Sequence, residues 1–193
     1  MEEGFLKYAI PSGLSSIEMK KVSILDICFG LGYNSLAGIL ELLKNPKVDN
    51  IDMTGIELDP EIINKIKDNP LDIPEYSLFR ELSSADHVQR ILGEKKIKME
   101  LLIGDARKAV KKLVRNYDFV FLDPFSPKRC PELWSEEFFG NIFEKMNPES
   151  ILTTYSCARK VRDNLRNVGF IVEDGPKVYR RGPRSEEHTS ELQ

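Results

Sequence analysis

Residues 24–34 read ILDICFGLGYN, an apolar run that passes into two closely spaced glycines. The run begins two residues earlier and is interrupted only by Asp26, a pattern typical of a strand covered on both faces of a parallel sheet. Gly30 and Gly32 supply a turn, and the following NSLAGILELL has helical spacing, with Asn34 or the next serine as its cap. The segment therefore predicts a strand, a glycine turn and a helix in succession.

The rest of the chain continues this alternation. Further strands are predicted at 51–58, 98–103, 117–122, 151–155 and 170–173, and further helices at 60–67, 105–115, 135–146 and 158–168. Residues 69–95 follow the pattern less clearly because prolines interrupt it, and one helix around 84–92 is expected there. Strands that alternate with helices imply an α/β fold, with a Rossmann-like, doubly wound and mostly parallel sheet.

The composition is that of one globular domain. The 193 residues are 41% hydrophobic and 31% charged, and no apolar run approaches the roughly 20 residues of a membrane span. The N-terminus MEEGFLKYAI lacks a secretory-signal pattern, so a cytoplasmic location is expected. Cys28, Cys130 and Cys157 lie far apart without a CxxC pair, which argues against a disulfide framework and a thiolate zinc site. No metal is expected.

The last ten residues, 184–193, read RSEEHTSELQ and look like a translated sequencing adapter. They are polar and aperiodic and are left out of the fold prediction. The expected organisation is one domain over 1–183 and a non-native tail over 184–193, with the sheet truncated on its C-terminal side.

Glycine or carboxylate follows each of the first four predicted strands. These residues are Gly30 and Gly32, Glu57, Asp105 and Asp123. Ligands of open α/β sheets bind outside the carboxyl ends of the strands, so these residues should surround one site. Glycines let a ligand approach the backbone, and an acid after the second strand can accept both ribose hydroxyls of an adenosine. A cofactor that contains a nucleoside is therefore predicted.

Further features favour S-adenosylmethionine over a dinucleotide. Asp105 is suited to hold an adenine amine, and Asp26 an amino-acid ammonium group. A dinucleotide site usually has a third glycine where this chain has Ser35. Acids at strand ends also cap helices, so an N-cap role alone is the alternative for Asp105.

The fourth predicted strand leads into LDPFSPKRCPELW, the candidate reaction centre. Asp123 is followed by Pro124 and Phe125, which resembles the D-P-P-Y motif of amino-methyltransferases. A carboxylate that accepts the N–H bonds of an amine, beside an aromatic wall, aims the nitrogen lone pair at a methyl group. Asp123 and Phe125 are therefore the predicted catalytic residues. A proline-stiffened loop with a core phenylalanine is the alternative.

Several stretches together resemble a known family: FGLGYN, IELDP, GDAR, FLDPFSPKRCPELWSEEFF, TTYSCARKVRDNLRNVGF and GPKVYRRGP. They are similar to the MnmC-like methyltransferases of tRNA 5-methylaminomethyl-2-thiouridine synthesis, over about 24–183, with 123–139 the most distinctive part. The resemblance implies a class I methyltransferase fold that methylates the aminomethyl group of 5-aminomethyl-(2-thio)uridine at the tRNA wobble position. Many members read D-G-F where this chain has D-P-F, and the flavin oxidase domain of bifunctional members is absent, so a stand-alone form is implied.

The predicted site has two parts. Cofactor contacts are expected from Asp26, Gly30, Gly32, Asn34, Glu57, Asp105, Ala106 and Asp123. Substrate contacts are expected from Phe125, Pro127, Lys128, Arg129 and Tyr155.

Basic residues are the expected tRNA contacts, because neutralised phosphates supply much of the affinity for RNA. They cluster at 108–115, 128–129, 159–166 and 177–181. A solvated outer face is the alternative for the helical clusters, and it is favoured for 108–115. RNA contact is favoured for Lys128 and Arg129. Aromatic rings near the sheet edge are candidates to stack a flipped uridine, although Trp134 is better read as a core anchor.

Three other functions fit parts of the pattern. A spermidine-synthase-type aminopropyltransferase also pairs a glycine turn with acids at strand ends. A non-catalytic RNA-binding module with a methyltransferase fold would use the basic clusters alone. An NAD-dependent oxidoreductase is the third alternative.

Overall fold

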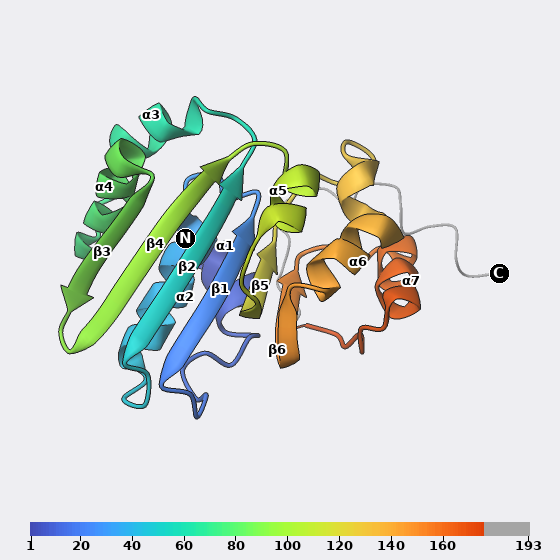
Figure 1. Ribbon diagram of the computed structural model, residues 1–193, viewed down its shortest axis with the longest axis horizontal. Coiled ribbons are helices and arrows are strands. Elements are labelled where there is room, and N and C mark those ends of the chain that lie inside the picture. Colours follow the sequence, from blue (N-terminus) through green and yellow to red (C-terminus); the bar gives the residue numbers. More distant parts are fainter. Residues whose placement is uncertain (176–193) are drawn as a thin grey trace.

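The computed structural model describes residues 1–175, and its centre is a six-stranded sheet in the order β3-β4-β2-β1-β5-β6 (Figure 1). The strands are β1 Lys21–Ile27, β2 Asn50–Glu57, β3 His87–Leu92, β4 Lys95–Ile103, β5 Tyr117–Leu122 and β6 Met146–Thr154. Five strands run parallel, and β3 pairs antiparallel with β4. The predicted α/β, mostly parallel sheet is confirmed.

Helices cover both faces of the sheet, as expected for a doubly wound fold. They are α1 Glu2–Gly4, η1 Phe5–Ala9, α2 Tyr33–Lys44, α3 Ile62–Lys67, η2 Pro74–Tyr76, α4 Ser77–Ala85, α5 Ala106–Lys112, η3 Pro131–Trp134, α6 Glu136–Phe143 and α7 Arg159–Val168. One core cluster joins η1 and α2 to α4 against the sheet, and a second joins α5, α6 and α7 against the opposite face. None of the helices that the structure describes is long and apolar enough to cross a membrane.

Strand β1 lies in the middle of the sheet because its side chains are apolar on both faces. Ile24 belongs to the first core cluster, whereas Leu25 and Ile27 belong to the second. This alternation is what a continuous apolar run predicts for a strand between two helical layers. The turn after β1 differs from prediction at one point: Gly32, in left-handed conformation, takes the N-cap position of α2, and no side chain caps that helix.

The predictions for two segments are wrong. Residues 84–92 were expected to be helical, but α4 ends at Ala85 and residues 87–92 form β3. This edge strand buries only Val88, so it lacks the apolar alternation that identifies strands, and it forms by pairing with β4 across a turn at Gly93. Residues 170–173 form no strand. The N–H of Phe170 instead binds the Leu165 carbonyl at 3.1 Å and closes the end of α7.

Candidate active site

The carboxyl ends of the three central strands bring the predicted residues together. Ile27, the last residue of β1, pairs with Ile56 on one side and with Leu122 on the other. Glu57 directly follows Ile56, and Asp123 directly follows Leu122. The two acids therefore flank the turn that follows β1. The Asp123 N–H extends this pairing by donating to the Ile27 carbonyl at 3.1 Å.

Glu57 orients the glycine turn. Its Oε2 accepts the Gly30 N–H at 2.8 Å, and its Oε1 accepts the N–H groups of Leu58 at 2.8 Å and Asp59 at 3.0 Å. A carboxylate has about four acceptor sites, so three backbone donors leave about one for a ligand. Glu57 can thus accept one ribose hydroxyl directly, and accepting two requires one backbone bond to give way.

Gly32 is required by packing as well as by backbone conformation. Its φ is +75°, and an added Cβ would lie 2.5 Å from Phe79 Cδ1 and 2.8 Å from Phe29 Cζ. Phe79 stacks on Tyr76, whose hydroxyl binds the Leu31 carbonyl at 2.9 Å. The turn is therefore held by aromatic side chains of η2 and α4. Both elements lie within residues 69–95, where the sequence predicts secondary structure least clearly.

Gly30 leaves room for a ligand. Its φ is +55°, and an added Cβ would meet only the Cys28 carbonyl, at 3.9 Å. The backbone at this point is therefore open to a ligand, next to the Glu57 carboxylate. An open glycine turn beside a carboxylate fits the nucleoside part of S-adenosylmethionine.

Asp123 is held by two side-chain donors, one on each oxygen. Tyr8 donates its hydroxyl to Oδ1 at 2.6 Å, and Asn34 donates its amide to Oδ2 at 2.9 Å. Asn34 was predicted as a site residue, and the structure places it against Asp123. Tyr8 was not predicted, because it lies 115 residues before Asp123 in a short N-terminal segment without a motif.

Asp26 lies beneath the glycine turn rather than on its surface. It is 0% exposed, and its Oδ2 accepts both the N–H and the hydroxyl of Ser35, at 3.1 Å and 2.6 Å. Among residues 1–175 its Oδ1 has no hydrogen-bond partner. Burial, with a contribution from the Asp123 charge, raises the pKa of Asp26 to about 8. To hold an ammonium group, as predicted, Asp26 would need the first turn of α2 to move.

We expect Asp26→Asn to change how stability depends on pH. The folded-state pKa of Asp26, about 8, lies above the value of about 4 expected in the unfolded chain. Between these values the unfolded chain releases a proton that the folded protein keeps, so rising pH lowers the wild-type free energy of unfolding. The variant lacks this linkage. Urea unfolding should therefore show wild type losing a few kcal/mol relative to the variant between about pH 4 and pH 8. A constant difference across that range would contradict the assignment.

Asp105 has the geometry of a helix cap. Its side chain accepts the Arg107 N–H at 2.9 Å at the start of α5 and also binds the Arg107 guanidinium. That guanidinium holds the pKa of Asp105 below its usual range. Ala106, the first residue of α5, is buried. The N-cap alternative accounts for the bond from the Arg107 N–H, and the contact of Asp105 with adenine stays a prediction.

The loop after β5 presents an aromatic ring outward. Phe125 is 66% exposed, so it is not a core phenylalanine, and the Arg129 guanidinium lies 4.3 Å from the centre of its ring. The Phe125 carbonyl accepts hydrogen bonds from Trp134 Nε1 at 2.8 Å and from Cys130 Sγ at 2.9 Å. Trp134 is buried, which confirms its role as a core anchor.

The other predicted substrate residues lie in the same loop or bind to it. Pro127 is half-buried and Lys128 is exposed. The Tyr155 hydroxyl donates to the Pro124 carbonyl at 2.9 Å, and its ring packs edge-on against Trp134. Tyr155, directly after β6, therefore supports the loop that follows β5.

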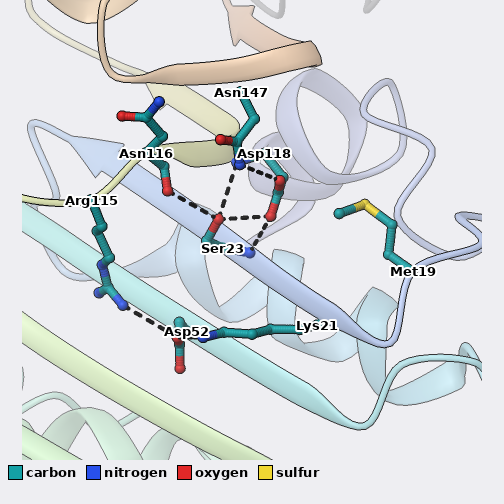
Figure 2. A pocket seen from close by; sticks show the side chains of 8 residues that line it. All are labelled: Met19, Lys21, Ser23, Asp52, Arg115, Asn116, Asp118 and Asn147. Atoms are coloured by element: carbon teal, nitrogen blue, oxygen red, sulfur yellow. Dashed lines mark hydrogen bonds and ion pairs between the residues drawn. The ribbon is translucent and has the colours of Figure 1, made fainter.

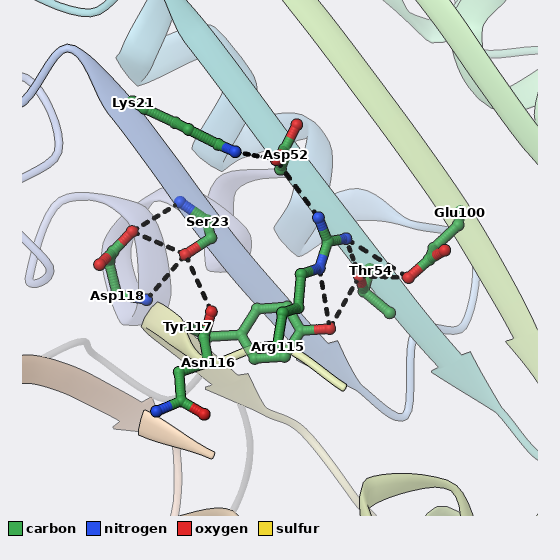
Figure 3. A network of polar contacts seen from close by, with 9 residues as sticks. All are labelled: Lys21, Ser23, Asp52, Thr54, Glu100, Arg115, Asn116, Tyr117 and Asp118. Carbon is green, nitrogen blue, oxygen red and sulfur yellow. Dashed lines mark hydrogen bonds and ion pairs between the residues drawn. The ribbon is translucent and has the colours of Figure 1, made fainter. Parts of the chain in front are cut away.

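A separate cavity of about 260 Å³ lies at the opposite, amino edge of the sheet, and charged and amide side chains line it (Figure 2). Ser23 binds Asp118 there through its N–H and its hydroxyl, at 2.8 Å and 2.7 Å. Arg115 pairs with Asp52 at 3.3 Å and donates to Thr54, in a network that joins β1, β2, β4 and β5 (Figure 3). Arg115, counted in the first basic cluster, is thus part of the scaffold.

Burial raises the pKa of the Cys28 and Cys130 thiols, which disfavours the thiolate. Within residues 1–175, no group of three or more His, Cys, Asp or Glu side chains could hold a metal ion.

Comparisons with known proteins agree with this geometry. A model of the S-adenosyl-L-methionine-dependent methyltransferase family matches residues 74–186. An uncharacterised protein of Methanocaldococcus jannaschii is 31% identical over 94% of this chain and 49% of its own length. The MnmC bifunctional protein of tRNA 5-methylaminomethyl-2-thiouridine biosynthesis from Azoarcus sp. is 32% identical over 79% of this chain and 25% of its own.

Solved structures show the same fold. The crystal structure of MnmC2 from Aquifex aeolicus has a TM-score of 0.73 and 31% identity, over 93% of this chain and 57% of that chain. A precorrin-6y C5,15-methyltransferase from Geobacter metallireducens has a TM-score of 0.54 at 17% identity, which supports the fold alone. The chain spans about half the length, or less, of these curated relatives. On the family match and the glycine turn with its strand-end acids, the chain belongs to the S-adenosyl-L-methionine-dependent methyltransferases.

Proposed function

We propose that this methyltransferase acts on tRNA, methylating the amino group of 5-aminomethyl-(2-thio)uridine at the wobble position. The observation that carries the proposal is Asp123, a carboxylate held by two donors at the carboxyl edge and followed by the exposed ring of Phe125. Relatives named for tRNA 5-methylaminomethyl-2-thiouridine biosynthesis support the choice of substrate. A cytoplasmic location stays a prediction.

Asp123 is suited to orient an amine. Each of its oxygens already accepts one protein hydrogen bond, which leaves an acceptor site on each for a substrate N–H. S-adenosylmethionine, when bound, supplies an electrophilic methyl group. Hydrogen bonds from the amine to Asp123 would turn the nitrogen lone pair towards that methyl group and stabilise the positive charge that grows on nitrogen during transfer.

Phe125 and Arg129 together offer a surface for a nucleobase. RNA-binding proteins stack unpaired bases on aromatic rings and on guanidinium planes. The exposed Phe125 ring with the Arg129 guanidinium 4.3 Å from its centre provides both next to Asp123. Lys128, exposed in the same loop, adds positive charge for RNA phosphates.

Ion pairs on the helices favour a solvated outer face, rather than RNA contact, for the helical basic clusters. Lys111 pairs with Glu137 at 3.2 Å on the neighbouring helix, and Arg166 pairs with Asp163 at 3.1 Å on its own. Arg162 pairs with Asp174. Cations already paired with acids contribute less to phosphate binding. The loop after β5 is the favoured RNA contact because it directly follows Asp123 and exposes the Phe125 ring. The fourth basic cluster, 177–181, lies outside the described residues.

The test is incubation of the purified protein with labelled S-adenosylmethionine and tRNA that carries 5-aminomethyl-2-thiouridine. We expect label in 5-methylaminomethyl-2-thiouridine after digestion and nucleoside analysis, and none with tRNA that lacks the aminomethyl group. Decarboxylated S-adenosylmethionine is the parallel cofactor. Aminopropyl transfer from it would favour the spermidine-synthase alternative, and tRNA binding without any transfer would favour a non-catalytic RNA-binding module.

A further inference from the structure

The N-terminal segment contributes a side chain to the candidate active site. Helix α1 and the π-helical turn η1 lie against the start of α2, and Gly4 makes this approach possible: an added Cβ there would lie 2.9 Å from the Tyr33 carbonyl. The segment places Tyr8 in the core, 1% exposed, with its ring edge-on to Phe121 at 5.8 Å.

The position of Tyr8 does not depend on its hydroxyl. The Ser12 side chain and the Ser12 N–H both bind the Tyr8 carbonyl, at 2.6 Å and 3.2 Å. The ring packs among buried apolar residues of the first core cluster. Removing the hydroxyl while keeping the ring should therefore leave the segment in place.

Among the residues that the structure describes, the hydroxyl makes one hydrogen bond, to Asp123 Oδ1 at 2.6 Å, within the distance typical of a charge-assisted bond. Burial, and the negative charge of Asp123, raise the pKa of Tyr8 far above its ordinary value. The phenol therefore keeps its proton and is the donor in the bond to Asp123.

We propose that Tyr8 is a positioning residue for methyl transfer. This inference rests on the proposed function, in which Asp123 orients the substrate amine. One donor on one carboxylate oxygen would leave the group free to turn about its last side-chain torsion, which is broad for aspartate. Tyr8 on Oδ1 and Asn34 on Oδ2 fix the plane of the carboxylate, so its remaining acceptor sites point in set directions.

The test compares Tyr8→Phe with the control Tyr117→Phe. Tyr117 is equally buried, but its hydroxyl binds Thr54 at 3.0 Å in the network at the amino edge. For Tyr8→Phe we expect kcat to fall about 10- to 100-fold, since small errors in positioning can cost this much, while the Kd for S-adenosylmethionine stays within about twofold. Tyr117→Phe should keep the wild-type kcat. A folded Tyr8→Phe protein with wild-type kcat would overturn the inference.

A crystal structure of Tyr8→Phe provides a readout that does not depend on the substrate. We expect the Asp123 carboxylate to be rotated or split between orientations in the variant and single in wild type. An unchanged orientation would overturn the positioning role even if activity fell. Wild-type protein that transfers no methyl group to the tRNA would instead contradict the proposed function, and the two crystal structures would still decide the role of Tyr8.

Discussion

Asp123→Asn is expected to lower kcat for methyl transfer by about 10²- to 10³-fold, the range measured when one preorganised electrostatic partner of a reaction centre is removed. Asparagine keeps the shape of the side chain, but it loses the negative charge and turns one acceptor into a donor that faces Tyr8 or Asn34. The substrate amine would then lack one acceptor for its N–H bonds and the charge that stabilises it during transfer.

The measurement is single-turnover methyl transfer to tRNA that carries aminomethyl-uridine, with urea unfolding of each protein alongside. Asp163→Asn, on the outer surface of α7, is the control because Asp163 pairs, within residues 1–175, with Arg159 and Arg166 of its own helix. The control should keep wild-type kcat. A folded Asp123→Asn protein that transfers methyl at the wild-type rate would remove Asp123 from the mechanism.

Gly32→Ala has the largest expected effect on stability. The new methyl group would lie 2.5 Å from Phe79 Cδ1, and the backbone there has a φ of +75°. Left-handed conformation costs a non-glycine residue about 1–2 kcal/mol, and overpacking a filled core costs about 1–3 kcal/mol. We therefore expect the free energy of unfolding to fall by about 2–5 kcal/mol.

Gly140→Ala is the matched control. Gly140 lies within helix α6, and nothing stands within 4 Å of an added Cβ. Alanine in a helix is favoured over glycine by up to about 1 kcal/mol, so this variant should be as stable as wild type or more stable. Urea unfolding decides between these expectations. Equal stability of Gly32→Ala and wild type would show that Phe79 does not hold the turn.

Most of the fold could be predicted because its central strands, β1, β2 and β5, are buried on both faces. An apolar run such as that of β1 is visible in the sequence, and the alternation of strands and helices follows from it. Strand β3 could not be predicted in this way. It exposes most of its side chains at the edge of the sheet. It forms because its backbone pairs with β4, and backbone pairing does not require a particular pattern of side chains.

The candidate site was predictable as far as it depends on the ends of strands. Gly30, Glu57 and Asp123 meet because parallel strands end at one edge. The partner of Asp123 from the N-terminal segment, Tyr8, could not be predicted, because its place depends on how that segment packs on α2. The burial of Asp26 was missed for a similar reason: the start of α2 covers it.

S-adenosylmethionine is expected to bind at the carboxyl edge of the sheet, and calorimetric titration of three proteins measures whether it does. Glu57→Gln replaces the carboxylate that accepts backbone N–H groups with an amide. Lys21→Gln, which alters the cavity at the amino edge, is the control. We predict that wild type and Lys21→Gln bind S-adenosylmethionine with the same Kd, and that Glu57→Gln binds at least about tenfold more weakly, a loss of about 1.4 kcal/mol or more. Unchanged binding by Glu57→Gln, or lost binding by Lys21→Gln, would contradict the account.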